Sequence, residues 1–253
     1  MIVLKSREEI ERMRVASAIV AEVLAALRER AKPGVTTAEL DEVAEELTRK
    51  RGAKPAFKGY VVQGRVFPAT VCISVNEEVV HGVPSKRRVL KEGDIVGLDF
   101  GVSVDGYFGD AAMTVPIGKV PQKAQRLMDV TKAALEAGID AVRSGGYISD
   151  ISGAIQDVAE GAGYSLVREF VGHGIGRKLH EDPQVPNYRT GTRGVRIQEG
   201  LVLAIEPMVN EGGPEVYVRE DGWTAATRDG SLSAHFEHSV AVTANGPYIL
   251  TLA

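Results

Sequence analysis

Cysteine is almost absent from this sequence of 253 residues. Cys72 is the only one, which excludes an intrachain disulfide and predicts a protein of a reducing compartment, the cytoplasm. Long apolar runs are absent too. Nowhere do 18 apolar residues follow one another, and the N-terminal segment becomes charged within five residues, so neither a membrane-spanning helix nor a secretory signal is expected.

Positive charge is scarce as well. The formal net charge is −4, and no run of Lys and Arg is longer than three residues. Proteins that bind nucleic acid or an anionic membrane usually gather basic residues in one stretch or on one face. We therefore expect neither nucleic acid nor a membrane as a partner, and we interpret the chain as a cytoplasmic enzyme or binding protein.

The order of helical and strand patterns indicates an α+β protein. Capping boxes at Ser6–Glu9 and Thr36–Glu39 predict two helices, and strand patterns follow over residues 60–115. Two more helical patterns come next, separated by the glycines of residues 144–146 and ending near residue 160.

The second half of the chain repeats the order of the first. At an offset of 111 residues the helical regions align, so that Gly34 matches Gly145. No low-complexity linker separates the halves. We therefore predict one domain over residues 1–253, made of two pseudo-symmetric halves, about 1–118 and 119–253, that pack on one sheet.

An apolar hairpin in the first half carries two acids, Asp99 and Asp110. Asp105-Gly106 is a strong signal for a two-residue turn, because a type I′ turn needs positive φ at both central residues. The resulting register places Gly101 opposite Asp110 and makes the two acids diagonal neighbours on one face. Such a pair is either solvated on an exposed face or forms an acid dyad or metal site, since two close anions repel unless they share a proton or a cation.

Further polar residues interrupt apolar or glycine-rich patterns in the rest of the chain. Glu206 stands in an otherwise apolar strand, where an unpaired carboxylate would be costly to bury, and alternation places Glu237 where it can point inward with it. His173 lies between two glycines, with His180 seven residues later, in a segment that would also fit a phosphate-binding or flexible glycine loop. His81 ends a strand, where a surface histidine is the plainer interpretation.

Four carboxylates and one imidazole thus make one candidate site: Asp99, Asp110, Glu206 and Glu237, with His173. This set is too negative for one divalent ion to neutralise, whereas carboxylates that bridge two ions about 3.5–4 Å apart would resolve the charge. Oxygen ligands with one imidazole favour Mn, Fe or Co, with Zn also compatible, over thiolate chemistry. The residues alone favour a two-metal hydrolase and leave open the bond that it cleaves.

A resemblance to a known enzyme family rests on five stretches, namely SVNEEVVHGVP, GDIVGLDFGVSVDGYFGDAAMT, GHGIGRKLHEDPQ, AIEPMV and DGWTAATRDGSLSAHFEHSVAVT. In their order and spacing, the chain resembles the methionine aminopeptidases of the short type I class. The resemblance implies the duplicated "pita-bread" α+β fold, with a central antiparallel sheet and helices on its outer face. It also implies removal of the N-terminal methionine from nascent proteins and peptides, with a small second residue preferred.

The same resemblance implies a metal-binding role for each member of the candidate site. Asp110 and Glu237 would bridge two divalent ions, Asp99 would complete one of them, and His173 with Glu206 would complete the other. The ions would be Fe(II), Co(II) or Mn(II), with Zn(II) also compatible.

Three catalytic roles follow from the resemblance as well. Glu206 would take a proton from the attacking water, His180 would hydrogen-bond the first peptide carbonyl as it becomes an oxyanion, and His81 would contact the nitrogen of the scissile amide. Nascent polypeptide N-termini are then the expected partners, with transient ribosome association, and we expect a monomer.

The wall for the methionine side chain is implied at four apolar residues, each of which also fits a plain core: Phe67, Phe170, Leu179 and Trp223. The sequence departs from related bacterial enzymes nearby, because Val61 and Gly64 stand where a cysteine and an aromatic residue are expected. Backbone oxygens of Asn76, Glu78 and Ser233 match a structural site for a monovalent cation, Na or K, in relatives.

Two alternatives remain on the same fold. A proline-specific aminopeptidase or dipeptidase would share the five ligands, but those relatives carry a large additional N-terminal domain. A non-catalytic binding module would not need His81 and His180 beside an intact ligand set. Only 33 positions separate His173 from Glu206, which leaves no room for the helical insertion of type II enzymes.

Overall fold

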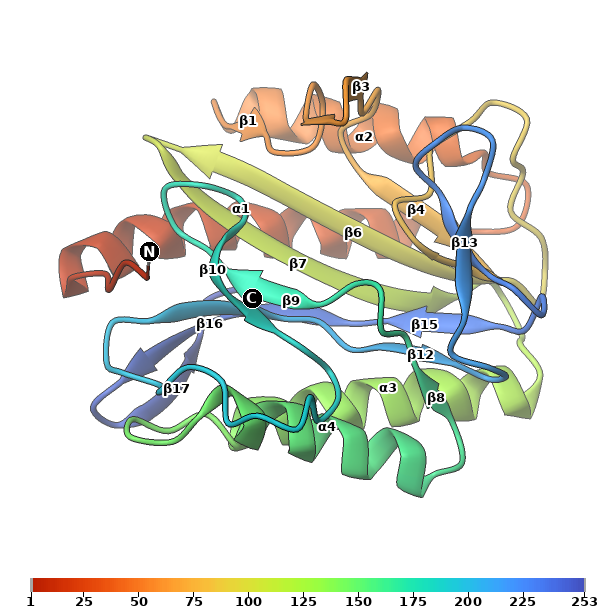
Figure 1. Ribbon diagram of the computed structural model, residues 1–253. Coiled ribbons are helices and arrows are strands. Elements are labelled where there is room, and N and C mark those ends of the chain that lie inside the picture. The colour runs from red at the N-terminus through yellow and green to blue at the C-terminus, as the bar shows by residue number, and fades with distance from the viewer. Residues whose placement is uncertain (1, 253) are drawn as a thin grey trace.

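The computed structural model of the protein describes residues 2–252. Its main feature is a curled antiparallel sheet with helices packed against it (Figure 1). The helices of this part of the chain are α1 (Arg7–Arg30), α2 (Thr37–Lys50), α3 (Gln122–Asp140) and α4 (Ile148–Gly161). Each corresponds to one of the helical patterns in the sequence, and the α+β pita-bread prediction is confirmed.

Nine strands form the main sheet. Along its path lie β1 (Lys54–Pro55), β6 (Ile95–Val104), β7 (Tyr107–Pro116), β16 (Glu237–Thr243), β11 (Val202–Ile205), β9 (Gly172–Gly174) and β10 (Glu181–Val185), in that order. Off this path, β4 (Cys72–Val75) pairs with β6 and β17 (Gly246–Ile249) pairs with β16.

Within the main sheet, the two halves of the chain meet where β7 pairs with β16 and Glu237 is in register with Ala112. All strand pairs of this sheet are antiparallel. Strands from each half therefore belong to one sheet, although the relation of the halves by duplication stays a prediction.

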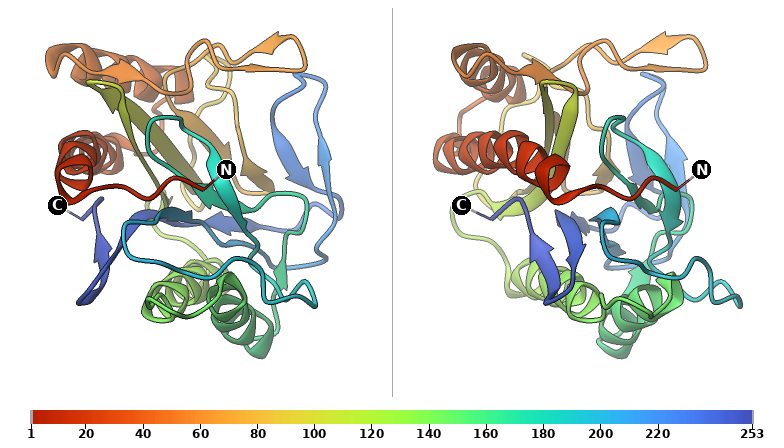
Figure 2. Two further views of the ribbon diagram at one scale, coloured as in Figure 1. Left: turned by 60° about the vertical axis from the view of Figure 1, so that its left-hand side comes forward. Right: turned by 90° about the vertical axis from the view of Figure 1, so that its left-hand side faces the viewer.

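Shorter strands make three small sheets beside the main one. The first contains β15 (Ser233–His235), β12 (Met208–Asn210) and β8 (Ser165–Leu166); the second contains β13 (Val216–Val218), β14 (Ala225–Thr227) and β5 (Glu78–Val80); and the third is the hairpin of β2 (Val61–Val62) with β3 (Arg65–Val66). Figure 2 shows β2, β3, β13 and β14 on the side of the molecule away from α1.

Both helices of the first half begin as their capping boxes predict. The Ser6 hydroxyl accepts a hydrogen bond from the backbone N–H of Glu9, whose carboxylate accepts one from the Ser6 N–H, and Thr36 with Glu39 repeats the arrangement. The apolar side of α1 then packs on β6 and β7, over the buried face of the hairpin that includes Leu98 and Phe100. This packing leaves the opposite face of the hairpin, which carries the acids, directed away from the helix.

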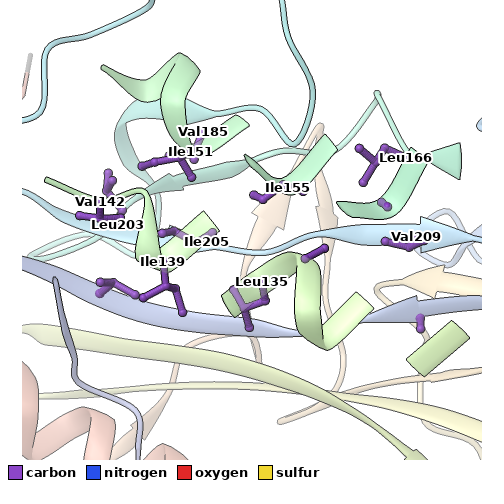
Figure 3. Close-up of a cluster of buried hydrophobic side chains, with 14 of the residues drawn as sticks. Leu135, Ile139, Val142, Ile151, Ile155, Leu166, Val185, Leu203, Ile205 and Val209 are labelled. Carbon is purple, nitrogen blue, oxygen red and sulfur yellow. The ribbon is translucent and has the colours of Figure 1, made fainter. Parts of the chain in front are cut away.

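Helices α3 and α4 cover the second half in the same way. Leu135 and Ile139 of α3 and Ile151 and Ile155 of α4 lie against β11 in one apolar cluster that also contains Leu203 (Figure 3). None of the helices in the described part of the chain is both long and apolar enough to span a membrane.

Candidate active site

A cavity of about 830 Å³ opens on the face of the sheet opposite α1 and draws its walls from both halves of the chain. Its lining contains every metal-binding, catalytic and side-chain-pocket residue expected from the sequence: Phe67, His81, Asp99, Asp110, Phe170, His173, Leu179, His180, Glu206, Trp223 and Glu237.

The hairpin of β6 and β7 has the register that its turn predicts. Asp105 and Gly106 have φ values of 49° and 79°, and Gly101 lies opposite Asp110. Asp99 is in register with Ala112, so the two acids are diagonal neighbours. Neither is solvated, because both carboxylates line the cavity and each has one buried oxygen without a hydrogen-bond partner.

His173 lies on β9, with a glycine on each side. A Cβ atom at Gly172 would collide with the carbonyl of Ala204 on β11, and one at Gly174 with the carbonyl of Asp182 at the edge of β10. The glycines therefore allow three strands to pack closely around His173. This finding replaces the alternative of a phosphate-binding or flexible loop.

Ligand atoms of three buried residues, Asp110, His173 and Glu237, all lie within 4.8 Å of one another. Glu206, which follows β11, completes the group, because its Oε1 atom is 3.5 Å from Nε2 of His173. The Nδ1 atom of His173 is 2.8 Å from the carbonyl oxygen of Gly174, so Nδ1–H donates there and the lone pair of Nε2 faces the acids.

Burial and mutual repulsion dominate the electrostatics of the four acids. Desolvation raises the pKa of Asp110 to about 7, and it raises the pKa values of Asp99, Glu206 and Glu237 well above their usual range, with the neighbouring carboxylates adding to each of these three. Burial, with a smaller effect from His180, lowers the pKa of His173 to about 3 and keeps its imidazole neutral.

These residues fit divalent metal ions. Asp99, Asp110 and Glu237 each present a buried oxygen that no protein group satisfies, and buried acids at this spacing need cations to balance their charge. Carboxylate oxygens with one neutral imidazole form a donor set typical of Mn, Fe, Co and Zn sites.

The two remaining histidines lie at the side of this group. His81 directly follows β5 with a φ of 60°, packs edge-on against Phe170 at 5.3 Å between ring centroids, and has its pKa lowered to about 4, mainly by burial. The ring of His180 lies 4.4 Å from that of His173, and burial lowers the pKa of His180 as well. His81 is half-buried, whereas His180 keeps an exposed side where the cavity opens.

Apolar side chains form the rest of the wall. Phe67 and Trp223 pack edge-to-face at 5.2 Å between centroids, and Leu179 is a buried residue of the same lining. Val61 and Gly64, the positions singled out as departures, are not among the lining residues, and Val61 is 60% exposed. Phe57, Tyr60 and Val62 of this segment line the cavity instead.

The expected cation loop comes from two segments of the chain. The backbone N–H of Ser233 donates to the carbonyl of Asn76 at 2.9 Å, which joins β15 to the turn that precedes Glu78. Glu78 lies on β5 in register with Ala226, and its buried carboxylate pairs with Arg219. A monovalent cation at this place stays a prediction.

Two polar residues near the site were not identified from the sequence. The buried Nε2 atom of His235 has no hydrogen-bond partner and lies 3.8 Å from Oε2 of Glu206. The alternation that placed Glu237 on the inward face also placed His235 there, because the two residues are two positions apart. Tyr60 hydrogen-bonds to His180, and no periodic pattern in the sequence around Tyr60 predicts that it lines the cavity.

Comparisons with known proteins agree with this geometry. Residues 11–244 match metallopeptidase family M24. The chain is 51% identical over 252 residues to the methionine aminopeptidase of Clostridium acetobutylicum, covering 100% of this chain and 99% of that protein. It is also similar to the crystal structure of methionine aminopeptidase from Thermotoga maritima, with a TM-score of 0.96 and 47% identity over 100% of both chains.

A prolidase from Pyrococcus furiosus shares the fold at lower similarity. The TM-score is 0.78 with 23% identity, over 99% of this chain and 66% of the prolidase. A match over most of the sequence, together with a relative at 51% identity over the full length, identifies the family. The chain belongs to metallopeptidase family M24.

Proposed function

We propose that the chain is a methionine aminopeptidase, which hydrolyses the first peptide bond of nascent proteins and peptides and prefers a small second residue. The observation that carries the proposal is the meeting of four carboxylates, three of them with an unpaired buried oxygen, with one neutral imidazole and two further histidines in one cavity with an apolar wall. Full-length similarity to proteins named methionine aminopeptidase supports it.

Five residues would hold two divalent ions: Asp99, Asp110, His173, Glu206 and Glu237. Fe(II), Co(II) and Mn(II) suit this donor set, and Zn(II) is compatible with it. When bound, such ions polarise a carbonyl group and lower the pKa of water, which is the chemistry that hydrolysis of an amide needs. Asp110 and Glu237 would serve both ions, Asp99 would complete the ligands of one, and His173 with Glu206 those of the other.

Three side chains would carry the proton transfers and the charge that develops on the substrate. Glu206 would accept a proton from the attacking water, since its carboxylate faces the cavity beside His173. His180 would donate a hydrogen bond to the oxygen of the first peptide carbonyl as negative charge develops on it. His81, which packs against Phe170 in the cavity lining, would contact the nitrogen of the scissile amide.

The methionine side chain would lie against the apolar part of the cavity. Phe67, Phe170, Leu179 and Trp223 present two edge-to-face aromatic contacts and one aliphatic surface, which suit a flexible, polarisable thioether. This pocket would select the first residue, while access to the cavity from outside would limit the second.

Other features of the proposal concern partners and location. The substrates would be the N-termini of nascent polypeptides in the cytoplasm, with transient association with the ribosome, and the enzyme would act as a monomer. One Na or K ion at Asn76, Glu78 and Ser233 would have a structural role.

The alternatives on the same fold have less support. A proline-specific peptidase is not favoured, because likeness to the prolidase at 23% identity shows the fold alone and leaves a third of that chain unmatched. A non-catalytic module would have no reason to combine the buried acids with His81 and His180.

A direct test uses the protein reconstituted anaerobically with Fe(II), Mn(II), Co(II) or Zn(II), each in a separate preparation. Substrates are Met-Ala-Ser, Leu-Ala-Ser, Met-Pro-Ser and N-acetyl-Met-Ala-Ser. We expect methionine release from Met-Ala-Ser only where a metal is present, with loss on chelation and no cleavage of the acetylated peptide. Broad cleavage of the leucine peptide would indicate a general aminopeptidase, and silence with every metal would contradict the proposal.

A further inference from the structure

Tyr60 makes a specific contact with one of the cavity histidines. Its hydroxyl oxygen is 2.7 Å from Nδ1 of His180, and the two rings meet edge-on, with centroids 5.4 Å apart and planes at 70°. Among the described residues, the Tyr60 hydroxyl has no other hydrogen-bond partner. Nδ1 is the ring nitrogen nearer the backbone. Nε2, at the far end of the imidazole, therefore remains available for a ligand.

The direction of this hydrogen bond determines which nitrogen of His180 carries a proton. A neutral imidazole has one N–H, and the nitrogen that accepts a hydrogen bond leaves the proton on the other. The phenol supplies a good O–H donor, whereas its oxygen is a weaker acceptor because its electrons are shared with the ring. Donation from Tyr60 to Nδ1 therefore places the proton of His180 on Nε2.

His173, only 4.4 Å away between ring centroids, shows the opposite arrangement. Its Nδ1 atom faces the carbonyl oxygen of Gly174, which can only accept, so the proton of His173 is on Nδ1 and its Nε2 carries a lone pair. With Tyr60 as the donor, the two neighbouring imidazoles have different partners and opposite tautomers. One can bind a cation through Nε2, and the other can donate a hydrogen bond from Nε2.

The chain holds Tyr60 in place through the base of a hairpin. The Tyr60 N–H donates to the carbonyl of Phe57 at 2.8 Å, and the Tyr60 carbonyl accepts from the N–H of Phe67 at 2.8 Å. The N–H of Gly59 donates to the carbonyl of Phe67 at 2.9 Å and closes the base. The base of the hairpin presents the phenol to His180, whereas Val61 and Val66 beyond it are exposed.

We propose that Tyr60 is a positioning residue that keeps the proton of His180 on Nε2, from where His180 donates a hydrogen bond to the carbonyl oxygen of the substrate. This role rests on the function proposed above. Tyr60 acts through His180 and leaves the ligand group of the acids unchanged.

The tautomer can be measured without metal or substrate. Wild-type protein with ¹⁵N-labelled histidine, in the metal-free form at about pH 8, gives separate signals for Nδ1 and Nε2, and His180→Ala identifies those of His180. We expect an unprotonated Nδ1 and a protonated Nε2 in the wild type, and a mixture of tautomers in Tyr60→Phe. A protonated Nδ1 in the wild type would overturn the proposal.

The kinetic consequence is tested in the reconstituted enzyme. Tyr60→Phe keeps the ring and removes only the hydroxyl, so we expect kcat for Met-Ala-Ser to fall about fivefold with KM nearly unchanged, as for loss of one ordinary hydrogen bond. The matched control is Tyr248→Phe on β17, an exposed tyrosine outside the cavity, which should behave as the wild type.

A double-mutant cycle separates positioning of His180 from a packing role. In a His180→Ala background, Tyr60→Phe should have no further effect on kcat, because the residue through which it acts is absent. An equal further loss in that background, or a wild-type kcat in Tyr60→Phe, would contradict the proposal. If the wild type released no methionine with any metal, the proposed function would fail, while the ¹⁵N measurement would still decide whether Tyr60 sets the tautomer.

Discussion

Nε2 of His173 lies 3.5 Å from Oε1 of Glu206, although the two residues are 33 positions apart in the sequence. The pairing of β9 with β11 produces this proximity, since His173 is in register with Ala204 two residues before Glu206. A neutral imidazole with its lone pair toward a carboxylate gains little from that neighbour alone. The arrangement becomes favourable when both share a cation, and this is the basis of the first prediction.

Replacing His173 with Ala should reduce metal occupancy and activity together. The change removes the one nitrogen donor of the group and leaves only carboxylates, so we expect affinity for one divalent ion to fall more than about 100-fold. Calorimetric titration of metal-free protein measures affinity, and elemental analysis measures occupancy. The matched control is His238→Gln, because His238 directly follows Glu237 on the other face of β16 and hydrogen-bonds Thr251 instead. Normal metal content with full activity in His173→Ala would remove His173 from the ligand set.

Asp99→Asn should weaken one of the two ions selectively. Asp99 is not part of the group Asp110, His173 and Glu237, whose ligand atoms lie within 4.8 Å of one another, and its unpaired oxygen is repelled by the neighbouring charge of Asp110. We expect a titration with Mn(II) to show one site near wild-type affinity and one weakened at least tenfold. Equal affinity at both sites would contradict the division of ligands between the two ions.

The sequence predicts local features of this site better than long-range ones. Asp105-Gly106 was sufficient for the register of β6 with β7, because a two-residue turn fixes which residues face each other. The anomaly of Glu206 also signalled a buried charge correctly. Nothing local shows that β7 pairs with β16, and that pairing alone brings Glu237 to Asp110. For such contacts the family resemblance supplied what periodicity and turn chemistry do not contain.

The path of the β2–β3 hairpin decides which residues of this segment reach the cavity. Val61 and Gly64, the two departures from related enzymes, are not among the lining residues, whereas Val62 of the same hairpin is. Tyr60, at the base of this hairpin, also lines the cavity. A loop without periodicity gives no sign of which residue turns inward, so only the three-dimensional path of the chain identifies it.

His180→Ala should lower kcat and leave both ions bound. His180 contacts the ligand group only through its ring, edge-on to His173, and its hydrogen bond is to Tyr60. Removing a donor to a developing oxyanion typically costs about 10²–10³ in kcat, and we expect an effect of this size with Met-Ala-Ser. Metal titration of the same variant is the control, and loss of either ion would show that His180 serves the metal site.

The stability of the metal-free protein should fall as pH rises above about 6.5. The folded-state pKa values of the four acids are raised, to about 7 for Asp110, whereas unfolded carboxyls ionise near pH 4. At neutral pH the folded chain therefore holds protons that the unfolded chain has released. Stability declines with rising pH wherever the folded state binds more protons, by about 1.4 kcal/mol per pH unit for each proton.

The buried histidines restrict the range in which this effect can be observed. Burial lowers the pKa values of His81 and His238 to about 4 and of His173 and His235 to about 3. Below pH 6.5 the unfolded chain binds protons that the folded chain does not, so stability contributed by these groups is lost as pH falls. Because the two effects oppose each other there, the test belongs between about pH 6.5 and 8.5.

Urea unfolding in EDTA at three pH values across this range measures the decline. Added Mn(II) should abolish or reverse it, since a divalent ion replaces the protons on the same carboxylates and binds better once they are ionised. In Asp110→Asn the amide cannot titrate, so the slope in EDTA should be shallower than in the wild type. A free energy of unfolding that stays constant or rises with pH in EDTA would mean that the acids are already ionised in the folded protein, and would contradict the charge balance on which the metal site is argued.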